Sequence, residues 1–191
     1  MIKRLCLPVL LLFTLALSGC FFDQPLTSLP SKDLNTWLLG VWQTTDDKGV
    51  VHQATLQPLT GSRYAVRYEI LGKTKRDTKL WLFEAWTARV GSAVYLNLKC
   101  EESAGQIPPG AYLFLHYQVV AQNTIVTRKL QLDSPQNATS YELRKELRLK
   151  LKEKTLYGPD VTVWQRTSEV YWSSDSYAPQ PPQPLRYPEH R

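Results

Sequence analysis

Few side chains in this sequence could form a catalytic or metal-binding centre. The 191 residues include three histidines, of which His52 and His116 lie in strand-like segments and His190 near the C-terminus. A metal site would therefore require the fold to bring distant residues together. Glu101 and Glu102 are adjacent, and adjacent side chains on an extended chain point in opposite directions, so we expect no shared acid–base role. With no phosphate loop, serine-nucleophile elbow or Cys-x-x-Cys pair, the sequence predicts no enzyme, no cofactor and no metal.

Cys20 is the cysteine whose surroundings indicate a specific reaction. The chain begins with the basic pair Lys3-Arg4, continues with a largely apolar run over 5–17, and reaches Ser18-Gly19-Cys20. A basic start, about 13 apolar residues and small residues at the cut are typical of a secretory signal peptide. The run is shorter than the roughly 20 residues that a membrane-spanning helix needs. We therefore expect residues 1–19 to be removed as a signal peptide.

The segment Leu17-Ser18-Gly19-Cys20 resembles the lipobox of bacterial lipoproteins. The resemblance implies that the Cys20 thiol receives a diacylglycerol and that the new amino group is acylated, for example with palmitate. Two or three acyl chains give stable membrane anchoring, whereas one is marginal. No Asp follows Cys20 directly, which by analogy with enterobacterial sorting indicates the outer membrane, facing the periplasm. Residues 20–32, with Pro25 and Pro30, are then expected to form a lipidated tether.

The composition indicates one globular domain with no nucleic-acid partner. Hydrophobic residues make up 43% of the chain and charged residues 21%, which favours a folded protein. Without Lys3 and Arg4, 21 basic side chains face 17 acidic ones, and a net charge of +4 is too mild to indicate nucleic-acid binding. Once Cys6 has left with the signal and Cys20 is lipidated, Cys100 alone remains, which excludes an intramolecular disulfide. We expect Cys100 to be a small buried apolar side chain.

Short alternating segments separated by turn residues predict β-strands in most of the chain. The clearest runs over 63–71, where Tyr64, Val66 and Tyr68 fall on one face. Seven such segments precede the one strong helix signal and an eighth follows it: 40–45, 50–57, 63–71, 79–89, 93–99, 111–120, 124–132 and 161–166.

The helix signal lies near residues 140–154. Thr139 and Glu142 have the spacing of a capping box, and Leu143, Leu147 and Leu151 form one apolar stripe. Strands with one helix predict a mainly β domain over 33–172, an antiparallel up-and-down barrel of about eight strands with an amphipathic C-terminal helix. The same alternation is compatible with a two-sheet sandwich. Residues 173–191 hold five prolines, and we expect a disordered tail there.

Gly40-Val41-Trp42, after a short helical segment over 33–39, resembles the Gly-x-Trp signature of lipocalins. The resemblance implies a barrel in which Trp42 packs across the closed end and an Arg from the segment after the C-terminal helix stacks on it. Arg166 is the residue at that position. Gly40, Trp42 and Arg166 would then form a structural lock. The chain is also similar to uncharacterised lipocalin-like bacterial lipoproteins, a likeness that implies a fold and a location but no activity.

Aromatic side chains in the central strands leave two functions open. A barrel interior lined by some of them could hold a small apolar or lipidic ligand. Alternatively, the rings fill a solid barrel, and the protein contacts another envelope component through its surface, for example the basic helix face around Arg144, Lys145, Arg148 and Lys152. The candidate ligand-lining residues are Tyr64, Tyr68, Trp81, Phe83, Tyr112 and Phe114.

Overall fold

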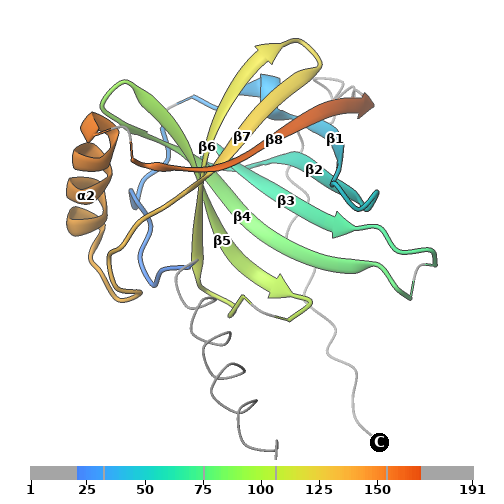
Figure 1. The fold of residues 1–191 in the computed structure, drawn as a ribbon, viewed down its shortest axis with the longest axis horizontal. Helices are drawn as coiled ribbons and strands as arrows, with labels where there is room; N and C mark the ends of the chain where they lie inside the picture. The colour runs from blue at the N-terminus through green and yellow to red at the C-terminus, as the bar shows by residue number, and fades with distance from the viewer. Residues whose placement is uncertain (1–20, 32, 75, 106, 154, 169–191) are drawn as a thin grey trace, which may run out of the picture.

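The computed structural model describes residues 21–31, 33–74, 76–105, 107–153 and 155–168 (Figure 1). The expected signal peptide over 1–19, the expected lipidation site at Cys20 and the Pro-rich tail over 173–191 lie outside the described residues.

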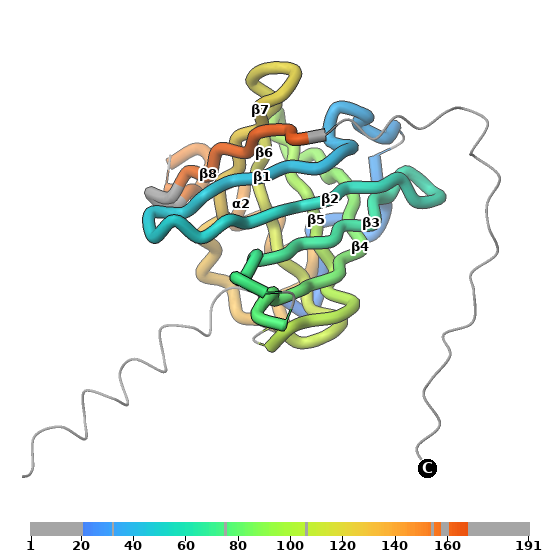
Figure 2. Tube along the Cα trace, turned by 90° about the vertical axis from the view of Figure 1, so that its right-hand side faces the viewer, coloured from blue at the N-terminus to red at the C-terminus, as the bar shows by residue number. Residues whose placement is uncertain are grey.

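The described residues form a closed antiparallel barrel of eight strands, in which each strand pairs with its neighbours in sequence and β8 closes onto β1 (Figures 1 and 2). The up-and-down barrel predicted from the sequence is confirmed, and the sandwich is excluded. The strands are β1 (Gly40–Thr45), β2 (Val51–Leu59), β3 (Arg63–Ile70), β4 (Lys79–Val90), β5 (Ala93–Ser103), β6 (Tyr112–Ala121), β7 (Thr124–Leu130) and β8 (Tyr157–Ser168). A short 3₁₀ helix, η2 (Thr36–Leu38), precedes β1, and the α-helix α2 (Ser140–Glu153) lies between β7 and β8.

The capping box predicted at the start of α2 is confirmed. The backbone N–H of Thr139 donates to the Glu142 carboxylate at 2.8 Å, and the backbone N–H of Glu142 donates to the Thr139 hydroxyl at 3.3 Å. The hydrogen bonds that the Thr139 N–H and hydroxyl donate to the carboxylate hold the pKa of Glu142 below its usual value. Leu143 and Leu147 are fully buried against the outside of the barrel, so the predicted stripe is the packing face of the helix.

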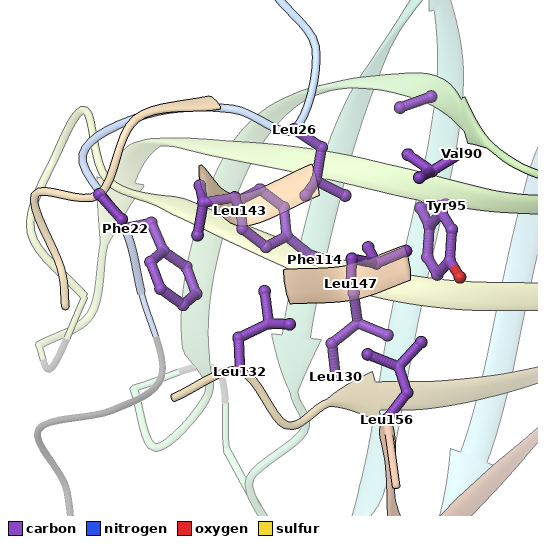
Figure 3. Packing of buried hydrophobic residues seen from close by; sticks show 12 residues of the cluster. Phe22, Leu26, Val90, Tyr95, Phe114, Leu130, Leu132, Leu143, Leu147 and Leu156 are labelled. Carbon is purple, nitrogen blue, oxygen red and sulfur yellow. The ribbon is translucent and has the colours of Figure 1, made fainter. Parts of the chain in front are cut away.

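Two apolar cores result, on the two sides of the barrel wall. Period-two alternation sends Tyr64 and Val66 of β3 into the barrel, where they join an interior cluster with Trp42. The second core lies between the outer wall and α2, and Figure 3 shows Leu143 and Leu147 of the helix within it. Strands β4 to β6 are therefore apolar on both faces.

Residues 21–31, here called the N-terminal strap, pack along the outside of the barrel, so the expected tether is wrong for this segment. The Phe22 and Tyr112 backbones exchange two hydrogen bonds, at 2.9 and 2.7 Å. Leu26 is fully buried, and its N–H donates to the side chain of Asn97 at 2.9 Å. The strap packs here because its apolar side chains, Phe22 and Leu26, complete the outer core. The local sequence, with its Pro and Ser residues, does not indicate this packing.

Candidate ligand-binding cavity

One end of the barrel is sealed by the residues predicted to form a structural lock. Trp42 is buried, and its indole N–H donates to the Leu38 carbonyl of η2 at 2.9 Å. The Arg166 guanidinium carbon lies 4.6 Å from the centre of the Trp42 ring, and the same group donates to the Trp37 carbonyl at 2.6 Å. Gly40 has a φ of 127°, a conformation that suits glycine and lets the chain turn from η2 into β1.

Tyr64 belongs to this closed end. Its side chain is fully buried, and its hydroxyl accepts from the Asn35 N–H at 2.8 Å. Burial raises the pKa of the Tyr64 hydroxyl far above its ordinary value. The Asn35 side chain also donates to the Tyr117 hydroxyl at 3.4 Å, which ties β3 and β6 to the segment before η2. Tyr64 is thus a sealing residue and does not line the cavity described next.

Beyond the closed end, the barrel and the strap line an open cavity of about 780 Å³ with mainly apolar walls. Tyr68, Trp81 and Phe83, three of the predicted lining residues, face this space. Leucine and isoleucine side chains supply most of the remaining wall: Leu56, Ile70, Leu98, Leu113, Leu115 and Ile125. The interior is therefore not filled by its aromatic rings.

The other two predicted lining residues, Tyr112 and Phe114, lie on β6 and belong to its outer face. Phe114 packs in the outer core, where its ring stacks on Phe22 of the strap with centroids 5.2 Å apart, and it borders the cavity together with Phe22. Tyr112 packs outside the barrel, edge-on to Trp86 at 6.0 Å. The prediction for Tyr112 is wrong because both faces of β6 are covered, so an apolar side chain there need not point inward.

A short hydrogen-bonded chain of polar groups lies at the end of the cavity away from Trp42. Nδ1 of His52 is 2.6 Å from the Tyr68 hydroxyl, and Nε2 is 3.5 Å from the Asp46 carboxylate. A hydrogen bond from the Val50 N–H holds the pKa of Asp46 below its ordinary value, whereas burial raises the pKa of Tyr68. The geometry positions the Tyr68 hydroxyl beside apolar walls, an arrangement that could orient a ligand.

Trp81 adds a hydrogen-bond donor beside this chain. Its ring centre lies 5.4 Å from that of Tyr68, and its indole Nε1 is buried without a hydrogen-bond partner in the described structure. A buried donor without an acceptor is energetically costly. The Nε1 atom itself has almost no accessible surface, so an oxygen atom of a ligand could accept from it only after a neighbouring side chain moves. Sequence reasoning placed Trp81 in the cavity but missed His52 and Asp46, whose proximity depends on the β1–β2 turn.

The two strand histidines lie on opposite sides of the barrel wall and cannot share a metal ion. His52 contacts Tyr68 inside, whereas His116 lies outside between Tyr95 and Tyr157, with ring centres 5.7 and 5.0 Å away. Within the described ranges, no group of three His, Cys, Asp or Glu side chains gathers at one place. Cys100 is fully buried, as expected, and burial raises the pKa of its thiol.

No family model, curated protein or solved structure matches this chain. In the part of the chain that the structure describes, no helix is both long and apolar enough to cross a bilayer.

Proposed function

We propose that this protein is a lipid-anchored lipoprotein of the cell envelope whose lipocalin-like barrel binds a small apolar or lipidic ligand. The observation that carries the proposal is the apolar cavity of about 780 Å³. Sites for small molecules have volumes of roughly 300–1,000 Å³ and mostly apolar walls with a few polar groups. The Tyr68 hydroxyl is one such group, and the buried Trp81 indole N–H could become a second if a neighbouring side chain moves.

These polar groups favour an amphipathic ligand over a pure hydrocarbon. After such a movement, a ligand with a carbonyl, carboxyl or ester oxygen could accept from Trp81 while its apolar part lies against the leucines of β5 and β6. Pairing the Trp81 N–H would remove the cost of leaving it unbonded. The Tyr68 hydroxyl, held by His52, would restrict the position of the same oxygen.

The anchor and the family rest on sequence motifs. The lipobox at Leu17-Ser18-Gly19-Cys20 supports lipidation at Cys20, and by analogy a place on the outer membrane facing the periplasm. The Gly40-Val41-Trp42 motif, together with the stacking of Arg166 on Trp42, supports a lipocalin-like protein.

The alternative is a non-enzymatic structural lipoprotein that contacts an envelope component through its surface. Lys145, Arg148 and Lys152 are exposed on α2 and available to an acidic partner. Arg144 is not available in the same way, because it donates to the Leu26 carbonyl of the strap. The cavity favours ligand binding over this alternative, which assumed a solid barrel.

A matched pair of alanine variants tests the proposal. Ala54 on β2 lines the cavity, whereas Ala65 on the paired strand β3 alternates to the outside. We expect residues 21–191, exported to the periplasm, to bind the fluorescent fatty acid cis-parinaric acid saturably. Ala54→Trp should weaken this binding at least tenfold and Ala65→Trp should leave it unchanged. Absence of saturable binding in the wild type, or equal binding by both variants, would contradict the proposal.

A further inference from the structure

The N-terminal strap brings the start of the described chain to the mouth of the cavity. Phe21 and Phe22 both contribute to the cavity wall. Phe22 pairs with Tyr112, the first residue of β6, at the end of the barrel opposite the Trp42–Arg166 seal. Residue 20 is covalently next to Phe21, and consecutive Cα atoms are only about 3.8 Å apart. A lipid attached at Cys20 would therefore begin beside the cavity mouth.

Hydrogen bonds attach the strap to the rest of the fold close to residue 20. The Asp23 N–H donates to the Gln136 carbonyl at 2.9 Å, and the Gln136 side chain donates back to Asp23 at 3.0 Å. Ser140 of α2 donates to the Pro25 carbonyl at 2.6 Å, one residue before the fully buried Leu26. The strap is thus fixed to the barrel from Phe22 onward, which leaves only Phe21 between that fixed segment and Cys20.

The mouth also carries a cationic loop. Lys73, Arg76 and Lys79 are exposed in or next to the β3–β4 connection, and Asp77, the acidic residue among them, accepts from the Thr74 hydroxyl at 2.8 Å. Asp47 is an exposed acid in the β1–β2 connection, and Glu101 and Glu102 are exposed acids near the end of β5. The β3–β4 side is therefore the part of the rim suited to anionic lipid headgroups.

We propose that the barrel stands with its mouth on the membrane surface and takes the acyl chain of a bilayer lipid directly into the cavity. This inference rests on the proposed function and names the source of its ligand. An acyl chain that enters between Phe21, Phe22 and the cavity walls keeps apolar contact throughout, and so avoids the cost of exposing its methylenes to water. The headgroup would remain at the rim, near the cationic loop.

Acyl chains attached to Cys20 would have the same chemistry and would begin next to Phe21, at the same mouth. If one of them fills the cavity, the anchored protein cannot accept a bilayer lipid, whereas a form without the lipid anchor can. Comparing the anchored protein with residues 21–191 therefore shows whether the acyl chain in the cavity comes from a bilayer lipid or from Cys20.

Orientation is tested with two single-cysteine reporters on the anchored full chain. Lys73→Cys places a fluorophore at the mouth, and Gln122→Cys places one on the exposed β6–β7 turn at the closed end. Cys100 is fully buried and should not react. In vesicles of phosphatidylethanolamine and phosphatidylglycerol that contain headgroup-nitroxide lipid, we expect at least fivefold stronger quenching at residue 73 than at residue 122. Equal quenching, or stronger quenching at residue 122, would overturn the orientation.

Uptake is tested in the same vesicles with a phosphatidylethanolamine that carries a diazirine at the end of one acyl chain. After illumination, we expect adducts on interior residues such as Leu115 or Phe83, reduced at least fivefold in Ala54→Trp and unchanged in Ala65→Trp. Interior adducts in residues 21–191 but none in the anchored protein would overturn the inference and assign the cavity to the Cys20 acyl chains. Failure of residues 21–191 to bind cis-parinaric acid would instead remove the proposed function itself.

Discussion

Arg166 stacks on Trp42 across the seam where the first and last strands of the barrel meet. The two residues are direct register partners in the β1–β8 pair, and the guanidinium carbon lies 4.6 Å from the indole centre. Arg166 also binds the Trp37 carbonyl, while Trp42 binds the Leu38 carbonyl. One pair of side chains therefore closes the barrel and fixes the 3₁₀ helix η2 over its end.

Removing the guanidinium should destabilise the barrel. The cation–π contact contributes about 0.5–2 kcal/mol, and the charge-assisted hydrogen bond to Trp37 adds about 1.5–3 kcal/mol. We expect Arg166→Ala to lower the free energy of unfolding by about 2 kcal/mol or more in urea titrations. Arg166→Lys, which keeps the charge without the planar fork, should lose about half as much. A double-mutant cycle with Trp42→Phe that shows no coupling would contradict the lock.

The outer core should be as important for stability as the barrel interior. Leu147 is fully buried between α2 and the wall, whereas Leu149 on the same helix is 56% exposed. Truncation of a buried leucine to alanine costs about 2–5 kcal/mol. We expect Leu147→Ala to show a loss in this range by chemical unfolding, and Leu149→Ala to remain within about 0.5 kcal/mol of the wild type. Similar losses for the two variants would show that α2 does not pack as described.

His116 should make stability depend on pH. Burial, together with the nearby Arg128, lowers the pKa of His116 below its ordinary value of 6.5, so the folded state binds this proton less readily than the unfolded state. Stability is therefore highest above pH 6.5 and falls as the pH drops through 6.5 toward the folded pKa. We expect the fall between pH 8 and pH 5 to be smaller in His116→Gln, measured by urea unfolding at each pH. A constant difference between variant and wild type across this range would refute the assignment.

Lipidation should depend on the thiol of Cys20. Because the transfer needs a sulfur nucleophile at this position, Cys20→Ser should accumulate as an uncleaved or soluble form without acyl label. The check is metabolic labelling with palmitate in a bacterial host, followed by fractionation of membranes. Continued acyl labelling of the variant would refute the anchor.

The sequence predicted the barrel because its strands alternate and are separated by clear turn signals. The capping box of Thr139 and Glu142 and the stripe through Leu143 and Leu147 located the helix equally well. The pairing of Trp42 with Arg166 followed from a motif resemblance, and the structure confirms the contact.

Features that depend on distant contacts could not be predicted. The local sequence of the strap is typical of a tether. Its packing is not visible there, because the burial of Leu26 depends on Asn97 and α2, which lie far along the chain. The position of Tyr112 was equally hidden. Alternation separates the two faces of a strand, but when both faces are apolar it does not show which face is the interior one. The interior volume was equally hidden, since it depends on how closely the rings approach one another.

The most direct test of ligand binding is native mass spectrometry of residues 21–191 purified from the periplasm, followed by organic extraction. The proposed function predicts a stoichiometric extra mass that extracts into organic solvent and is absent from Ala54→Trp. A clean apo mass that persists after incubation with cell-envelope lipid extract would contradict it, and would direct attention to the surface of α2.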